Sequence, residues 1–133
     1  LSHAVKLDTS GSAPGVLETL LSAKLLDYVA MDYKAPLRRY LEICGKEAAG
    51  VEESLSLLFA SGVPFELRTT VIPELKEEDL VEMAGAVPVL PRYFLQQFRA
   101  VPGYEKAVLY NRADLAAFRE RILPMQPNAQ LRV

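Results

Sequence analysis

The sequence predicts a single α/β domain built on a parallel sheet, and three observations lead to this fold class. The 133 residues suit one compact domain by length. Half of them are apolar and only 24% are charged, which provides the material for a core. Four short strand-like runs alternate with segments of helical periodicity. Strands separated by helices pair in parallel, because a crossover has to return the chain to the same edge of the sheet.

The first strand–helix unit is predicted from a turn-rich stretch between two apolar segments. Residues 4–7 form the strand, and residues 8–12 are dense in turn formers and helix N-caps. Pro14 suits the first turn of the following helix, in which leucines recur at three- and four-residue spacings. The second strand is expected over 28–31.

Two helices are expected to follow the second strand. Pro36 cannot sit inside a helix but can open one, and glycine commonly ends one. The first helix is therefore predicted over 37–43, before Gly45, and the second over 51–60, before Gly62.

The third strand, 65–72, has the clearest pattern, because it is rich in β-branched residues and bounded by prolines. A helix with acidic residues in its first turns follows over 76–86. The fourth strand is predicted over 93–98, and Asn111 is a good N-cap for a last helix that ends near Leu123. We expect residues 124–133 to be irregular.

Composition argues against several classes of protein. A formal net charge of −2 gives no electrostatic footprint for nucleic acid, and no apolar run reaches the roughly 18 residues that cross a bilayer. There is no basic-then-apolar leader, and the lone Cys44 cannot form an internal disulfide, so a cytoplasmic location is expected. Because the chain opens Leu1-Ser2-His3 without an initiator Met, we expect it to be cut from a longer protein.

Polar residues interrupt the carboxyl ends of strands that should be mostly apolar under helices, and ligands gather at these ends in parallel α/β proteins. Alternation puts Arg68 and Thr70 on one face and Thr69 on the other. The basic residues could pair with a carboxylate, the acids with an amine, and the hydroxyls and amides with a ribose or purine. A small zwitterion with a polar heterocycle is therefore the predicted ligand. The candidate residues are Asp8, Thr9, Ser10, Gly11, Asp32, Lys34, Arg68, Thr70, Gln96 and Gln97.

Four phrases of the sequence, in order and at family-like spacing, resemble the radical S-adenosylmethionine superfamily, in particular the activases of glycyl-radical enzymes. The group that they resemble most is the activating protein of anaerobic ribonucleoside-triphosphate reductase, which is related to pyruvate formate-lyase activase. The phrases cover most of residues 4–99 and are Val5 to Gly11, Asp27 to Pro36, Phe65 to Val71 with Pro73, and Leu95 to Arg99.

The resemblance implies a fold and a set of roles. The chain would be the C-terminal four β/α units, strands 3 to 6, of a partial (β/α)6 TIM-like barrel. Residues 8–11 would line the methionine end of S-adenosylmethionine, Lys34 would contact its carboxylate and Arg68 its polar groups, while Gln97 or Phe98 would lie near the adenine. It also implies a monovalent-cation site whose ligands would be Asp8, Thr9, Asp32 and the backbone carbonyl of Ala30.

The sequence departs from this family at the cluster. The family holds a [4Fe–4S] cluster on a Cys-x3-Cys-x2-Cys loop and grips the cofactor's amine with a Gly-Gly-Glu-Pro segment, and neither occurs here. One thiolate, Cys44, cannot replace three cluster ligands. We therefore expect this chain alone to be inactive, to contain no catalytic residue and to hold no cofactor.

Three functions remain open from the sequence. In the first, the intact parent reductively cleaves S-adenosylmethionine and abstracts hydrogen from a glycine of a partner, the anaerobic ribonucleoside-triphosphate reductase. In the second, the parent is another radical enzyme acting on a small molecule or a tRNA precursor. In the third, the chain is a non-catalytic flavodoxin-like binding module. A four-stranded half-barrel would also expose apolar edges, so we expect self-association or a rearranged N-terminus to cover them.

Overall fold

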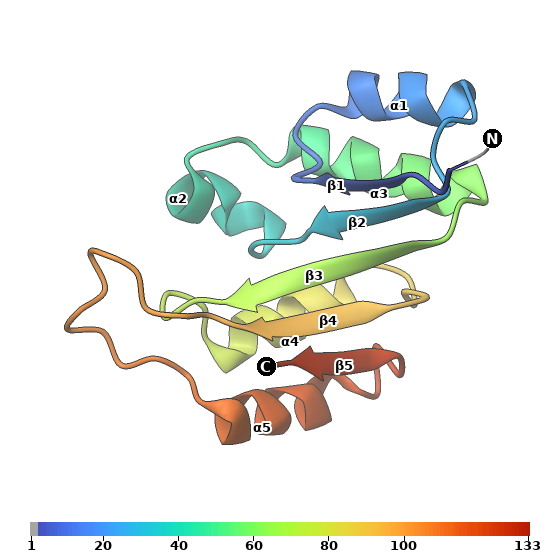
Figure 1. The fold of residues 1–133 in the computed structure, drawn as a ribbon. Coiled ribbons are helices and arrows are strands. Elements are labelled where there is room, and N and C mark those ends of the chain that lie inside the picture. Colours follow the sequence, from blue (N-terminus) through green and yellow to red (C-terminus); the bar gives the residue numbers. More distant parts are fainter. Residues whose placement is uncertain (1–2) are drawn as a thin grey trace.

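The computed structural model describes residues 3–133 and forms one five-stranded, fully parallel sheet (Figure 1). Every strand pairs with the next strand along the chain, in the order β1-β2-β3-β4-β5. The strands are β1 (Lys6–Thr9), β2 (Tyr28–Asp32), β3 (Phe65–Val71), β4 (Tyr93–Gln97) and β5 (Ala129–Arg132). The helices are α1 (Pro14–Ser22), the 3-10 turn η1 (Leu37–Arg39), α2 (Tyr40–Cys44), α3 (Ala49–Ser61), α4 (Glu77–Gly85) and α5 (Arg112–Ile122).

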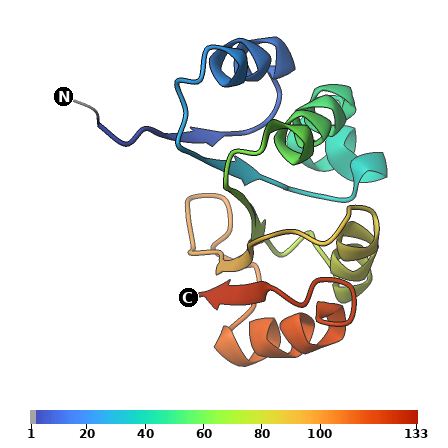
Figure 2. The ribbon, with the colours of Figure 1, turned by 90° about the vertical axis from the view of Figure 1, so that its right-hand side faces the viewer.

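The sheet has the strand order of a barrel segment. A flavodoxin-like sheet reverses its order at a switch point, whereas this order never reverses. Figure 2 shows the sheet curving, with the helices along its outer side and no helix on its inner side. The predicted parallel α/β fold is confirmed, as is its character as part of a TIM-like barrel.

The core lies between the outer face of the sheet and the helices. In β3, Phe65, Leu67, Thr69 and Val71 alternate toward this side and are all buried. The inner-face residues between them include charged and hydroxyl side chains, so the two faces of the same strand differ in chemistry. The inner face is therefore the face that is chemically suited to a polar ligand.

One strand was missed by the sequence prediction. Residues 124–133 are not irregular, because Ala129–Arg132 forms β5 against β4. The turn before β5 is fixed by Gln126, a fully buried side chain that accepts a hydrogen bond from the amide of Leu90 (2.9 Å) and donates one to the carbonyl of Ala84 (3.0 Å). This buried carboxamide carries no signal in a local hydrophobic pattern. The sheet therefore has five strands where four were expected.

The predicted helix boundaries and caps are otherwise close to the observed ones. Asn111 accepts a hydrogen bond from the amide of Asp114, as expected of an N-cap, and Gly45 and Gly62 both end helices with positive φ. The helix predicted over 37–43 begins as the 3-10 turn η1 and continues as α2. Within residues 3–133, none of the helices combines the length and the apolar character that a membrane crossing requires.

Candidate functional site

The inner face of the sheet brings together the charged residues that the sequence singled out on β1, β2 and β3. The strand register pairs Asp32 directly with Arg68, and it pairs Asp8 with Ala30. Because side chains alternate along each strand, Asp8, Asp32 and Arg68 all reach the same side. Thr69 points the other way, into the core, as expected.

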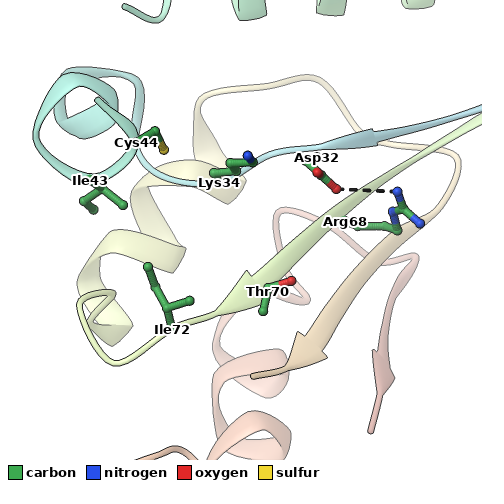
Figure 3. Close-up of a pocket in the computed structure, with 7 residues that line it drawn as sticks. All are labelled: Asp32, Lys34, Ile43, Cys44, Arg68, Thr70 and Ile72. Carbon is green, nitrogen blue, oxygen red and sulfur yellow. Dashed lines mark ion pairs between the residues drawn. The ribbon is translucent and has the colours of Figure 1, made fainter. Parts of the chain in front are cut away.

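Arg68 forms the centre of this charged group. Its Nη2 lies 3.7 Å from Oδ1 of Asp8 and 3.5 Å from Oδ1 of Asp32, and the second of these pairs is drawn in Figure 3. The Arg68 side chain is 17% exposed, against 62% for Asp8 and 40% for Asp32. Its Nε is buried and has no hydrogen-bond partner among residues 3–133. Buried donors in native proteins are nearly always paired, so this nitrogen is free to bind a ligand or a water molecule.

A cavity of about 270 Å³ opens beside this charged group. Figure 3 shows Lys34 and Cys44 on one side of it and Thr70 and Ile72 on the other, with Asp32 and Arg68 at one end. The cavity thus combines charges of both signs with an apolar wall. It is lined by Asp32, Lys34, Ile43, Cys44, Arg68, Thr70 and Ile72.

The turn after β1 is shaped by a glycine that no other residue can replace without strain. Gly11 has a φ of +74°, and a Cβ at this position would lie 2.8 Å from Sδ of the buried Met31. Its amide donates to Oγ1 of Thr9 (3.1 Å), and its carbonyl accepts from the buried Ser54 hydroxyl (2.7 Å). Ser10, on the same turn, lines a small neighbouring cavity of about 70 Å³ together with Lys34. The turn is therefore held tightly at the edge of the site.

Neither Gln97 nor Phe98 lines the main cavity, and the predicted residues of β1 and the turn after it, Asp8 to Gly11, are also absent from its lining. Gln97 is paired with the buried Val71, on the face that the helices cover, and it is the neighbouring Gln96 that accepts a hydrogen bond from Thr70 (3.3 Å). Phe98 packs against Tyr104, with ring centroids 4.8 Å apart. The part of the site assigned to β4 is therefore not assembled around this cavity.

The sequence analysis missed a second polar cluster on the inner face. Glu66 is 4% exposed, accepts a hydrogen bond from the Tyr28 hydroxyl (2.8 Å) and lies 3.5 Å from Nη1 of Arg132. The Arg92 guanidinium also donates to the Tyr28 hydroxyl (3.3 Å). Alternation could have identified Glu66, which lies two residues before Arg68 on the same strand. Arg132 could not have been found, because its strand was not predicted.

An iron–sulfur cluster does not fit the residues present. Cys44 is the only cysteine. Burial raises the pKa of its thiol above the ordinary value, and the nearby charge of Lys34 offsets only part of this rise. No group of three His, Cys, Asp or Glu side chains that could hold a metal ion occurs within residues 3–133. The expected monovalent-cation set is only partly free, because the Arg68 guanidinium already lies close to both Asp8 and Asp32. A cation would have to share these carboxylates with it.

Comparison with known proteins adds two likenesses. No family model matches the chain. A protein of Methanocaldococcus jannaschii named "Putative glycyl-radical enzyme activating enzyme" is 34% identical to it over 109 residues, which is 77% of this chain and 45% of that protein. The chain thus spans about half the length of this relative.

A solved structure shares the fold. The crystal structure of a domain of pyruvate-formate lyase-activating enzyme from Bacteroides vulgatus aligns with a TM-score of 0.67, covering 99% of this chain and 100% of that one at 11% identity. At this identity the likeness concerns the fold alone. The sequence match makes the chain a relative of the glycyl-radical-enzyme activating enzymes of the radical S-adenosylmethionine superfamily, and the shared fold agrees with it.

Proposed function

We propose that the chain is the C-terminal part of a radical S-adenosylmethionine activase, in which it binds the methionine end of the cofactor. The observation that supports this most directly is the convergence of Asp8, Asp32 and Arg68 on one face, where Asp32 and Arg68 line a cavity together with Lys34. The four strands β1 to β4 would correspond to strands 3 to 6 of the family barrel, with β5 added after them.

The residues of the cavity suit a zwitterion. Lys34 and Arg68 would pair with a carboxylate, and Arg68 offers a planar fork where Lys34 offers a point charge. Asp32 and Asp8 would pair with the ammonium group. Thr70 and the turn hydroxyls would supply hydrogen bonds to neutral polar groups. In the intact parent the cofactor would supply the radical chemistry, and the residues of this site would bind and orient it.

The cluster has to come from outside these residues. Because Cys44 is a single thiol, this chain alone would be inactive and would hold the cofactor weakly. The partner that we propose is a glycyl-radical enzyme, and specifically the anaerobic ribonucleoside-triphosphate reductase, on the strength of the four resembling phrases. A cytoplasmic location belongs to the same proposal.

The proposal is tested first on the coding sequence upstream of Leu1, which should contain a Cys-x3-Cys-x2-Cys loop. The protein that includes it is then reconstituted without oxygen. Its cluster should give an electron paramagnetic resonance signal that changes on addition of S-adenosylmethionine. Lys34→Met and Arg68→Met should each weaken cofactor binding about tenfold or more, as expected for a lost charged hydrogen bond.

Arg121→Met provides the matched control, because Arg121 pairs with Glu77 on the helical surface, away from the cavity (2.9 Å). Binding in this variant should equal that of the parent. Absence of the cysteine loop would overturn the radical-enzyme proposal. Unchanged binding in both cavity variants would overturn the site assignment alone.

The choice of partner needs a separate measurement. Incubating the reconstituted protein with anaerobic ribonucleoside-triphosphate reductase and cofactor should produce a glycyl radical with its characteristic doublet. A protein that cleaves the cofactor but leaves the reductase without a radical would instead support the small-molecule or tRNA-precursor alternative.

A further inference from the structure

Lys34 lines the cavity although it lies beyond the end of strand β2. The strand β2 stops at Asp32, so the sheet ladder does not hold Lys34. Tyr33, just before it, is well fixed: its amide donates to the carbonyl of Arg68 (2.8 Å), and its carbonyl accepts from Thr69 (2.6 Å). Something other than the sheet must therefore fix the backbone at Lys34.

That role falls to Tyr40, the first residue of α2. The amide of Lys34 donates to the Tyr40 hydroxyl oxygen at 2.7 Å, and Tyr40 is only 3% exposed. Burial raises the pKa of Tyr40 to about 12, so the hydroxyl stays protonated at neutral pH. A buried hydroxyl thus replaces the ladder bond that the end of β2 removes.

The helix that carries Tyr40 is itself anchored. Just before it, Arg39 forms an ion pair with the nearly buried Asp79 of α4, and Arg38 forms one with Glu82 of the same helix (2.8 Å). The far end of α2 supplies Cys44 to the cavity wall. The backbone of Lys34 is therefore connected through Tyr40 to a helix whose own position is fixed.

We infer that Tyr40 is a positioning residue, whose hydroxyl sets where Lys34 stands in the cavity. The inference rests on the proposed function, because it takes Lys34 to be the group that meets the ligand's carboxylate. It does not require Tyr40 to touch the ligand. Removing the hydroxyl should leave the buried ring in place and release the Lys34 backbone.

The first test uses this chain and Tyr40→Phe. Amide hydrogen exchange at Lys34, followed by nuclear magnetic resonance, should accelerate about tenfold, the factor that corresponds to a lost hydrogen bond. Alkylation of Cys44, the only thiol, should also become several times faster, because the wall beside Lys34 loosens. Tyr110→Phe is the matched control, since its hydroxyl donates to the carbonyl of Leu75 (2.7 Å), outside the cavity. It should change neither rate.

The second test uses the reconstituted protein with its cluster. Tyr40→Phe should weaken S-adenosylmethionine binding about tenfold, and adding it to Lys34→Met should produce no further loss, because the two changes act through one contact. If Lys34→Met binds normally, Lys34 does not meet the ligand's carboxylate, and the inference about Tyr40 is overturned with it. If Lys34→Met weakens binding and Tyr40→Phe does not, or if Lys34 exchange is unchanged, the inference about Tyr40 is wrong while the site stands.

Discussion

Replacing Thr69 by Val should destabilise the domain far more than the loss of one surface hydroxyl would. Thr69 is fully buried, and its hydroxyl donates to the Tyr33 carbonyl (2.6 Å). The single proton of the hydroxyl is used there, so the 2.6 Å contact with Tyr93 has the Tyr93 phenol as donor. Val has nearly the same shape but leaves both of these buried groups without their partner.

The size of the effect follows from those two groups. Each buried polar group left unpaired costs about 1–3 kcal/mol, and the added methyl group returns about 1 kcal/mol of burial. The net loss should be about 3 kcal/mol, a large part of the 5–15 kcal/mol that typically stabilises a domain. For 133 residues this corresponds to a fall in Tm of about 10 °C.

Urea unfolding followed by far-ultraviolet circular dichroism measures this loss, because the sequence has no Trp to serve as a fluorescence probe. Thr70→Val, at the exposed neighbour on the other face, should change the free energy of unfolding by less than about 0.5 kcal/mol. Tyr93→Phe removes the phenol that Thr69→Val leaves unpaired, so the double variant should lose about 1–2 kcal/mol less than the sum of the single losses. Strict additivity, or a Thr69→Val loss as small as that of Thr70→Val, would show that the buried pairing is not what stabilises β3.

Three further predictions concern the turn, the buried tyrosines and the open edges. Gly11→Ala should cost about 1–3 kcal/mol more in unfolding experiments than Gly45→Ala, because both positions have positive φ but only Gly11 faces Met31; equal losses would contradict this. Burial raises the pKa of the three tyrosines that lie in the core, Tyr33, Tyr40 and Tyr93, that of Tyr40 to about 12. Because tyrosine in the unfolded chain ionises near pH 10, these three groups should leave the free energy of unfolding unchanged below that pH. Above it the free energy of unfolding should fall, by about 4 kcal/mol at pH 11 for the three tyrosines together, and urea titrations of Tyr40→Phe should show a loss about a third smaller. If the free energy of unfolding of Tyr40→Phe falls with pH as steeply as that of the parent, the buried Tyr40 is not a source of this pH dependence. Because β1 and β5 each pair on one side only within residues 3–133, sedimentation should show concentration-dependent self-association, and a strict monomer at high concentration would refute it.

The sequence was informative where structure is determined locally. Period-two alternation correctly separated Thr69 from Arg68 and Thr70, and turn chemistry correctly placed the helix ends at Gly45 and Gly62. Local pattern could not reveal β5, whose four residues hold only two apolar side chains and depend on the distant contacts of Gln126. The strand β5 forms because of tertiary packing, and the local sequence pattern does not predict that packing.

The same limit applies within the site. Alternation predicts which face a side chain takes, but not which neighbour it meets across the sheet. The Arg68 guanidinium lies close to two carboxylates from two other strands. This placement depends on the register of β1, β2 and β3. The Tyr40 hydroxyl that holds Lys34 depends similarly on how α2 folds back over the end of β2. Both are contacts between segments whose relative placement no local pattern specifies.

The charge balance of the inner face explains how a zwitterion could enter at low electrostatic cost. Within the group of Asp8, Asp32, Arg68 and Lys34 the charges sum to zero, Lys6 lies 3.7 Å from Asp8 beside this group, and the partly buried Arg68 is already compensated by the two acids. An entering carboxylate would pair with Lys34 and Arg68, and the accompanying ammonium group would pair with the acids that Arg68 gives up, so both charges of the amino-acid end are paired in a partly buried site. Because ion pairs within the site are exchanged for new ones, the net gain from these contacts alone should be small. Tight binding would then need the additional contacts of the cluster segment, which is why we expect this chain alone to bind the cofactor weakly.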